Sequence, residues 1–383
     1  MPAVLSVIFT RRAFPVAASS LIARLPKGIT PLAVVTLIHQ TTGSFAAATA
    51  FGDAVSTPIQ GRLLDRYKRG QVLLPSATLY AAALALLPVL ATRHAPFGAL
   101  LGCSLLAGVG FPPISGSMKV LWPRLVAAGT PARTAYEAES LIQQVLLLFA
   151  PLSATMLTVW AGPAAAVWTA AAATLSGSIA FVYHAAQTDA GVADPPHRTG
   201  SALSAPRLRV LIAATAVQGL VFGAMPVVLP GLAVYAGAPD MGGLLLAAWI
   251  CGGVLGSFRR AQADFPLALA RLAIALAVPA IVAAATDGSL VATAAAFSVA
   301  GLFLTPVAAA SYVLVNDTTP RANRTEAFTW LSTALAVGGA AGSALAGATV
   351  DRLGILPAAF LPLTAAATAT AVAHLRTRTR PSR

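Results

Sequence analysis

Charged residues inside apolar stretches are the first candidates for chemistry in this chain. Arg24, Lys27 and Asp53 each lie within a run of otherwise apolar residues. A charge in such surroundings is costly unless it is paired, so it usually serves a function. Arg24 follows Arg12 by 12 residues, and Asp53 precedes Asp65 by the same number. At the rise of an α-helix, Arg24 and Asp53 are each about 18 Å from the same end of their helices.

The matching depth of these residues predicts a contact between neighbouring helices. We expect Arg24 and Asp53 to form an ion pair, or to alternate between each other and a substrate or a proton. Lys27, one turn beyond Arg24, is expected to share the same cavity. The alternative is a purely structural salt bridge, because desolvation can cancel much of the attraction between buried charges.

A second polar set lies nearer the helix ends. Lys119 precedes Arg124 by five residues, and Glu139 follows Arg133 by six. Lys119 and Glu139 are therefore expected about 7 to 9 Å inside the ends of their helices. Gln143 follows Glu139 by four residues and extends the same helix face. We predict that this face meets a water-filled cavity, with interhelical packing as the alternative.

Residue types that catalyse reactions or bind metals do not converge in the sequence. Cys103 and Cys251 lie in apolar runs, and no nucleotide-binding loop is present. The histidines fall at helix ends or in loops, at His39, His94, His184, His197 and His374. We predict that the protein is not an enzyme and that it holds no metal or cofactor.

The composition indicates which elements position these residues. The chain of 383 residues is 57% apolar and only 10% charged, whereas soluble domains carry about 25% charged residues. A membrane-spanning helix needs about 20 mostly apolar residues. We therefore predict an all-α integral membrane protein with twelve transmembrane helices, near 13–37, 44–64, 71–91, 97–121, 135–159, 163–184, 210–235, 241–258, 266–286, 289–315, 326–349 and 355–374.

The loops carry the positive charge mainly on one side. Alternate loops and the two ends hold 20 of the 25 basic residues, which predicts that both termini are cytoplasmic. A net charge of +13 also raises the possibility of nucleic-acid binding, but the basic residues form no continuous patch. We expect no nucleic-acid partner, and a monomer in the lipid bilayer. The Ala- and Arg-rich composition suggests a bacterial plasma membrane.

The two halves of the chain resemble each other. The segment 107–113, with Pro112 and Pro113, is echoed by 300–306 about half the chain later. Thr-Pro followed by Arg-Thr also occurs twice, before the fifth and the eleventh predicted helices. These echoes predict a duplication, with prolines that break the fourth and tenth helices. The expected parts are a six-helix bundle at 1–186, a linker at 187–209 and a second bundle at 210–383.

The most specific motif follows the second predicted helix. Its sequence from Gly61 to Arg69 is Gly-Arg-Leu-Leu-Asp-Arg-Tyr-Lys-Arg. This segment resembles the signature G-x-x-x-D-R-x-G-[RK] of the major facilitator superfamily, with Lys68 in place of the usual Gly. Gly61 permits close helix packing, Asp65 can accept hydrogen bonds from a helix N-terminus, and the arginines supply donors.

The resemblance implies a fold of two pseudo-symmetric six-helix bundles and a role for the motif. In that family the loop acts as a latch between the halves, closed in one state and broken in the other. Gly61, Asp65, Arg66 and Arg69 would then be conformational residues. The second half keeps glycines and arginines at 252–260 but has no Asp there, so its latch is expected to be degenerate.

The resemblance favours a secondary transporter that works by alternating access. The leading hypothesis is proton-coupled export of a small organic molecule such as a drug or natural product, with Asp53 or Glu139 carrying the proton. The family's exporters often have a glycine-rich stretch around the proline of the fifth helix, whereas 149–154 keeps Pro151 and lacks the glycines. Uptake of a sugar or metabolite is therefore the alternative, followed by a receptor that transports nothing.

Overall fold

The computed structural model describes residues 3–30, 33–34, 37, 49–127, 130–189, 202–238, 241–258, 264–285 and 289–377. These residues form helices joined by short connections, with no strand among them. The first half of the chain contains α1 (Ala3–Ile8), α2 (Ala13–Arg24), α4 (Thr49–Arg66), α5 (Arg69–Thr92), α6 (Phe97–Gly110), α7 (Ile114–Leu125) and α8 (Ala132–Asp189).

The second half begins with the 3-10 helix η1 (Ala202–Ser204), which only Ala205 separates from α9. Its elements are α9 (Pro206–Tyr235), α10 (Gly242–Gly256), α11 (Phe265–Ala285), α12 (Leu290–Gly301), α13 (Leu304–Thr318), the 3-10 helix η3 (Arg321–Asn323), α14 (Arg324–Leu353), α15 (Ile355–Ala359) and α16 (Leu361–Thr377).

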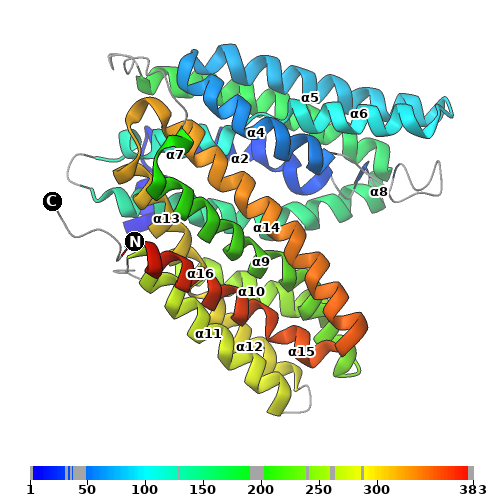
Figure 1. Ribbon diagram of the computed structural model, residues 1–383. Helices are drawn as coiled ribbons and strands as arrows, with labels where there is room; N and C mark the ends of the chain where they lie inside the picture. The colour runs from blue at the N-terminus through cyan, green and yellow to red at the C-terminus, as the bar shows by residue number, and fades with distance from the viewer. Residues whose placement is uncertain are drawn as a thin grey trace.

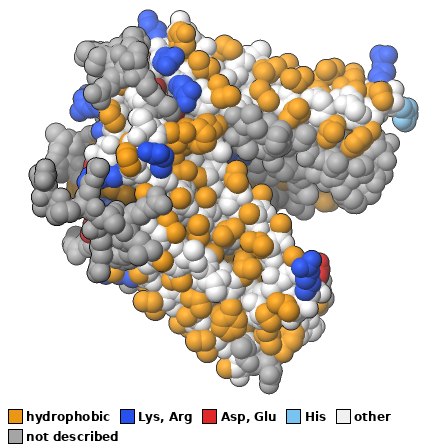
Figure 2. Space-filling model, in the orientation of Figure 1, with side chains coloured by type: hydrophobic (Ala, Val, Ile, Leu, Met, Phe, Trp, Pro, Cys, Tyr) orange, Lys and Arg blue, Asp and Glu red, His pale blue; other side chains and the backbone are white. Residues whose placement is uncertain are grey.

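The predicted fold class is confirmed. Helices occupy each of the twelve expected ranges, in whole or in part. In the described part of the chain, eight helical segments are long and apolar enough to cross a membrane. The protein is therefore an all-α, multi-pass membrane protein. Large apolar side chains are exposed over much of the surface in Figure 2, and they form the surface that faces lipid.

Proline and glycine interrupt the helices where the repeat predicted breaks. The fourth predicted helix is divided into α6 and α7 at 111–113, where two prolines provide no backbone N–H. The tenth is divided into α12 and α13 at 302–303. The helices before the two breaks end at Gly110 and Gly301, which supports the duplication inferred from the sequence.

The fifth and sixth predicted helices are continuous in α8 apart from one residue. Gly162 has φ of 85° and ψ of 161°, a conformation that disfavours side chains, and it reverses the chain between the two helices. Other connections at this end are also short: residues 93–96 join α5 to α6, and Gly354 alone, with φ of 87°, joins α14 to α15. We call this end of the molecule the far end.

The opposite end carries most of the charge, and we call it the basic end. It contains the end of α4, the connection from α7 to α8, and the start of α14 (Figure 1). Helix α1 and the end of α16 also lie on this side (Figure 1). Its arginines come from both halves and include Arg62, Arg66, Arg69, Arg124, Arg133, Arg321 and Arg324.

The buried apolar residues show how the halves meet. One large cluster combines both halves, for example Leu121 and Tyr136 with Tyr312 and Phe328. A smaller cluster, which includes Leu84, belongs to the first half alone and lies toward the far end. The halves thus share a core near the basic end and separate beyond it. They form two arms with a notch between them, which is visible on the right of Figure 2.

Within the second half, glycines allow two long helices to pack closely. Gly219 and Gly223 of α9 face Gly338 and Gly339 of α14, and a Cβ atom on Gly223 would collide with the Gly339 carbonyl. Small residues at such crossings let backbones approach in membranes, where apolar burial provides little driving force. This seam fixes α14, whose other surface contacts α4 and α7 of the first half.

Candidate functional site

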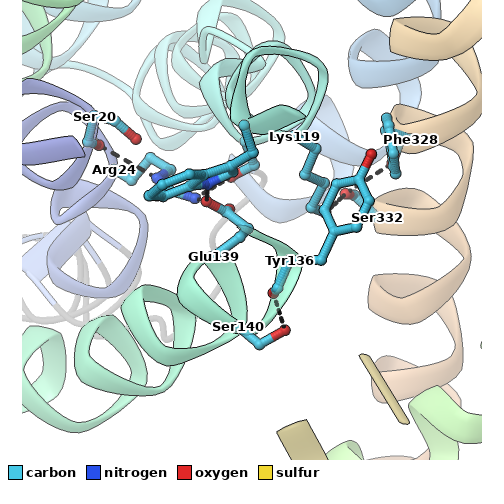
Figure 3. Close-up of polar contacts among 10 residues, drawn as sticks. Ser20, Arg24, Lys119, Tyr136, Glu139, Ser140, Phe328 and Ser332 are labelled. Carbon is cyan, nitrogen blue, oxygen red and sulfur yellow. Dashed lines mark hydrogen bonds and ion pairs between the residues drawn. The ribbon is translucent and has the colours of Figure 1, made fainter. Parts of the chain in front are cut away.

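A buried ion pair lies inside the first half. Arg24, the last residue of α2, donates from Nη1 to Oε1 of Glu139 on α8 at 2.5 Å (Figure 3). The second carboxylate oxygen of Glu139 accepts a hydrogen bond from the Trp122 indole of α7 at 2.7 Å. Arg24 is 3% exposed and Glu139 is 0% exposed. Three helices therefore hold one carboxylate between a guanidinium and an indole.

Arg24 retains hydrogen-bonding capacity after this contact. Its Nε donates to the Ser20 carbonyl at 3.3 Å, and Nη1 also reaches the Ser115 hydroxyl at 3.4 Å. Its Nη2 is buried and has no hydrogen-bond partner among the described residues. A buried donor of a cationic group needs an acceptor, so a ligand or water that reaches Nη2 would be bound strongly.

The sequence predicted Asp53 as the partner of Arg24. Asp53 lies on α4, but its side chain is outside the described residues, so the Arg24–Asp53 pair stays a prediction. The contact of Arg24 with Glu139 was not predicted, because residue counting gives the depth of a Cα atom along its helix and not the reach of a long side chain.

Lys119 links the two halves. From α7 of the first half, its ammonium lies 4.3 Å from the Tyr312 ring centroid and 6.0 Å from that of Phe328, both in the second half. It also donates to the Ser332 hydroxyl of α14 at 3.4 Å (Figure 3). Lys119 is 3% exposed. A desolvated cation over an aromatic face is attracted by the ring, so these contacts close the bundle at this level.

The other two predicted site residues lie outside the buried cluster. Lys27 is exposed, with its ammonium 5.4 Å from the Phe111 ring centroid. Gln143 is also exposed, although it follows fully buried Glu139 by one turn. A residue at i+4 lies about 6 Å further along the helix and is rotated by about 40°, enough to leave the contact between helices.

The aspartate of the motif at the end of α4 binds the N-terminus of a helix in the second half. The two carboxylate oxygens of Asp65 accept hydrogen bonds from the backbone N–H groups of Thr325 and Glu326, at 3.0 and 2.7 Å. These are free donors in the first turn of α14, where the helix dipole favours a negative charge. Asp65 thus joins the first half to the second.

Glu326 strengthens the same junction. It is 1% exposed, and its Oε1 accepts from Nη2 and Nε of Arg62 at 2.9 and 3.2 Å. Its Oε2 accepts from the Ala202 backbone N–H at 3.0 Å, which attaches the start of the second half. The roles of Arg62 and Glu326 were not predicted from the sequence, although the repeated Thr-Pro and Arg-Thr pairs place Glu326 in a first helical turn.

Glycine permits the helices at this junction to approach. A Cβ atom on Gly61 would collide with the Thr329 side chain of α14, and one on Gly116 of α7 would lie 2.9 Å from Cγ2 of the same threonine. Arg66 is exposed and Arg69 is partly exposed. We call the contacts of Gly61, Arg62 and Asp65 with α14 the latch junction, whose conformational role remains a prediction.

Metal ligands do not gather within the described part of the chain. No group of three or more His, Cys, Asp or Glu side chains there is close enough to hold an ion. The charged groups that the structure does bring together include the Arg24–Glu139 pair, the Lys119 ammonium between the halves and the Arg62–Glu326 pair of the latch junction.

Comparison with known proteins identifies the fold. No family model matches the sequence, and no curated protein does. A bacterial homologue of the iron transporter ferroportin, solved in an outward-facing state, is similar in structure with a TM-score of 0.76 and 16% identity, over 97% of this chain and 100% of that one.

Two further solved structures agree over nearly full length. The human organic anion transporter MFSD10 (TETRAN) gives a TM-score of 0.70 at 15% identity, over 95% of this chain and 99% of that one. The E. coli fucose:proton symporter FucP gives 0.64 at 14% identity, over 99% and 100%. With FucP solved as a major facilitator superfamily transporter, this chain has the major facilitator superfamily fold.

Proposed function

We propose that this protein is a secondary active transporter that works by alternating access and exports a small organic molecule in exchange for protons. The observation that carries the proposal is the buried Arg24–Glu139 pair. In the described part of the chain, the basic end is closed by contacts between the halves, among them Lys119 with Ser332 and Asp65 with Glu326. Ionisable groups inside a membrane bundle are costly and mark ion or substrate pathways. By the distribution of basic residues, the basic end is cytoplasmic and the closed side faces the cell interior.

Glu139 is the proposed proton carrier. When it is ionised, it is held by Arg24 and by the Trp122 indole. Protonation removes its charge and weakens the pair, so that Arg24 loses the counter-charge that Glu139 provides. The two forms of the site therefore differ in charge, and a proton that enters from one side changes what the site can bind.

The direction of coupling depends on which partner the substrate replaces. A substrate group that takes the place of Arg24 beside the Glu139 carboxylate competes with the proton, and this competition produces exchange and export. A substrate anion that takes the place of Glu139 beside Arg24 requires the protonated carboxyl group, and this requirement produces symport and uptake. Uptake is the second candidate function, and the observation that favours it is Nη2 of Arg24, which has no hydrogen-bond partner among the described residues.

The structural neighbours support the class of function. Their names describe an iron transporter homologue, an organic anion transporter and a fucose:proton symporter, so the fold carries chemically different substrates. Each of these proteins moves a small solute across a membrane, which supports a small-molecule substrate for this chain. A single folded chain contains both halves, so we propose that it acts as a monomer in the plasma membrane.

Transport by everted vesicles tests the proposal. Vesicles from cells that express the protein are energised and offered a panel of dyes, drugs and metabolites. Export predicts proton-driven accumulation inside everted vesicles that is lost in Glu139→Gln and kept in Glu137→Gln, a matched change on the same helix. Accumulation only in right-side-out vesicles would establish uptake instead. No flux of any compound in proteoliposomes would refute transport.

A further inference from the structure

A small basic pocket lies between the halves at the basic end, away from the Arg24 site. It has a volume of about 230 Å³ and is lined by Val120, Pro123, Arg124, Arg321 and Arg324. The first three residues belong to α7 of the first half, Arg321 belongs to η3, and Arg324 begins α14. The pocket therefore exists only where the two halves meet.

The described charged residues that line this pocket are all positive. Three of its five lining residues are arginines, and none of the described residues that line it is acidic. Asp317 attracts Arg324, whereas Arg321 and Arg124 repel it, and the Asp317 carboxylate is exposed and accepts a hydrogen bond from the Asn316 amide at 3.2 Å. Like charges at close range repel, so an anion in the pocket would stabilise the arrangement.

The arginine at the start of α14 is held in place by backbone carbonyls. Nη2 of Arg324 donates to the Asn316 carbonyl at 2.7 Å, and its Nε donates to the Thr319 carbonyl at 3.2 Å. These bonds use part of the five guanidinium donors and fix the plane of the group. A fixed guanidinium is preorganised for the oxygens of a phosphate or carboxylate, which it binds in a two-point fork.

We propose that this pocket binds a phosphate group, and that its occupant stabilises the closed basic end. The size suits the assignment, because a volume of about 230 Å³ holds several waters of about 30 Å³ each, or one tetrahedral oxyanion. The phosphate belongs to an anionic lipid headgroup or to a soluble phosphate compound. Basic pockets between transmembrane helices on the cytoplasmic side bind such headgroups.

The position of the pocket gives the ligand a defined effect. Its walls come from α7 and from η3 and α14, which must separate when the basic end opens. A ligand that binds one conformation better than another shifts the population toward it. The phosphate group would therefore act on the conformational equilibrium and leave the substrate site untouched, so this inference goes beyond the proposed function.

Two arms of one experiment test the site and its source. The full-length protein carries spin labels on cysteines at Arg66 and Asn316, which lie in different halves at the basic end. The distance distribution is recorded in detergent with inorganic phosphate or with chloride at equal ionic strength. It is also recorded in nanodiscs of phosphatidylcholine with or without phosphatidylglycerol. Each arm is repeated with Arg321→Gln and with Arg352→Gln, an exposed arginine at the far end as control.

The expected result is a larger closed population with phosphate or with phosphatidylglycerol in the parent and in Arg352→Gln. In Arg321→Gln the concentration needed should rise about tenfold or more, as for the loss of one charged hydrogen bond. A response to phosphatidylglycerol alone identifies a lipid headgroup, and a response to free phosphate identifies a soluble compound. No response in either arm, or an equal response in Arg321→Gln, overturns the proposal, and the distances in chloride verify that the variant is folded.

Discussion

At the scale of single residues, the Arg24–Glu139 pair combines stability with a titratable group. Both side chains are buried, and Glu139 also accepts the Trp122 indole N–H. Glu139→Gln keeps an acceptor for the indole but leaves Arg24 without its counter-charge. We expect the substitution to destabilise the protein by about 3 kcal/mol, the usual effect of breaking a buried pair, and to remove the proton dependence of transport.

The matched control for that prediction is Glu137→Gln. Glu137 pairs with Arg133 one turn earlier on α8, at 3.4 Å, and that arginine is 27% exposed. The Glu137 side chain is 11% exposed, and a pair with one partly exposed member contributes roughly 0.5–1 kcal/mol. Thermal unfolding in detergent should therefore distinguish the two variants clearly. Equal losses of stability would show that Glu139 has no special electrostatic role.

Lys119 permits a second prediction at this scale, about the contact between the halves. Tyr312→Leu removes the ring beneath its ammonium, whereas Tyr312→Phe keeps a ring. A desolvated cation–π contact contributes about 1–2 kcal/mol, so the leucine variant should increase the open population of the basic end five- to thirtyfold. Distances between spin labels at Arg66 and Arg321, both exposed, measure this change. If the phenylalanine variant opens to the same extent, the ring does not hold the cation.

At the scale of elements, the latch junction depends on a helix N-terminus. Asp65→Asn leaves one oxygen to accept from the start of α14 and turns an amide N–H₂ toward the second donor. The lost charge and hydrogen bond should weaken closure by about 1–2 kcal/mol. Labelling of a cysteine at Arg321 should become faster, and Asp351→Asn, an exposed change at the far end, should have no effect. Unchanged labelling in Asp65→Asn would count against the latch.

Helix packing at the same junction gives a prediction with a built-in rescue. A side chain on Gly61 of α4 meets Thr329 of α14, whereas one on Gly102 of α6 meets nothing within 4 Å. Gly61→Ala should therefore keep the basic end from closing fully and reduce transport, and Gly102→Ala should not. Combining Gly61→Ala with Thr329→Gly makes room for the methyl group and should restore transport. Failure of this rescue would place the effect elsewhere.

At the scale of the whole molecule, the proposed alternating-access cycle requires the halves to move apart at the basic end. A Cβ atom on Gly116 would lie 2.9 Å from Cγ2 of Thr329, and a cysteine at 329 has its sulfur at such a γ position. Cysteines at these two positions are therefore close enough to form a disulfide. We expect Gly116→Cys with Thr329→Cys, in a chain with Cys103→Ser and Cys251→Ser, to be inactive when oxidised and active when reduced. Activity of the oxidised protein would show that the halves do not separate there.

The sequence was informative about the fold because lipid imposes a simple pattern. Long apolar runs gave the helices, and the echo between Pro112 and the segment before Pro306 gave corresponding breaks. Asp65 was identified as a helix N-terminal acceptor because dipole and motif agree. The contact between Arg24 and Glu139 was not predicted, because counting along a helix gives the depth of a Cα atom and not the reach of the side chain. The pairing of Arg62 with Glu326 joins residues of different halves, and it depends on helix packing that the pattern of apolar residues along the chain does not reveal.

The short connections at the far end have a consequence for how solutes would enter there. Gly162 and Gly354 are single-residue turns, and four residues join α5 to α6. A movable lid is usually built from a loop of about 12 residues or more. None of these three described connections can fold over the mouth between the arms, so closure on their side would come from the tilting of whole helices. Selection of solutes by size would then occur deep in the bundle and not at its rim.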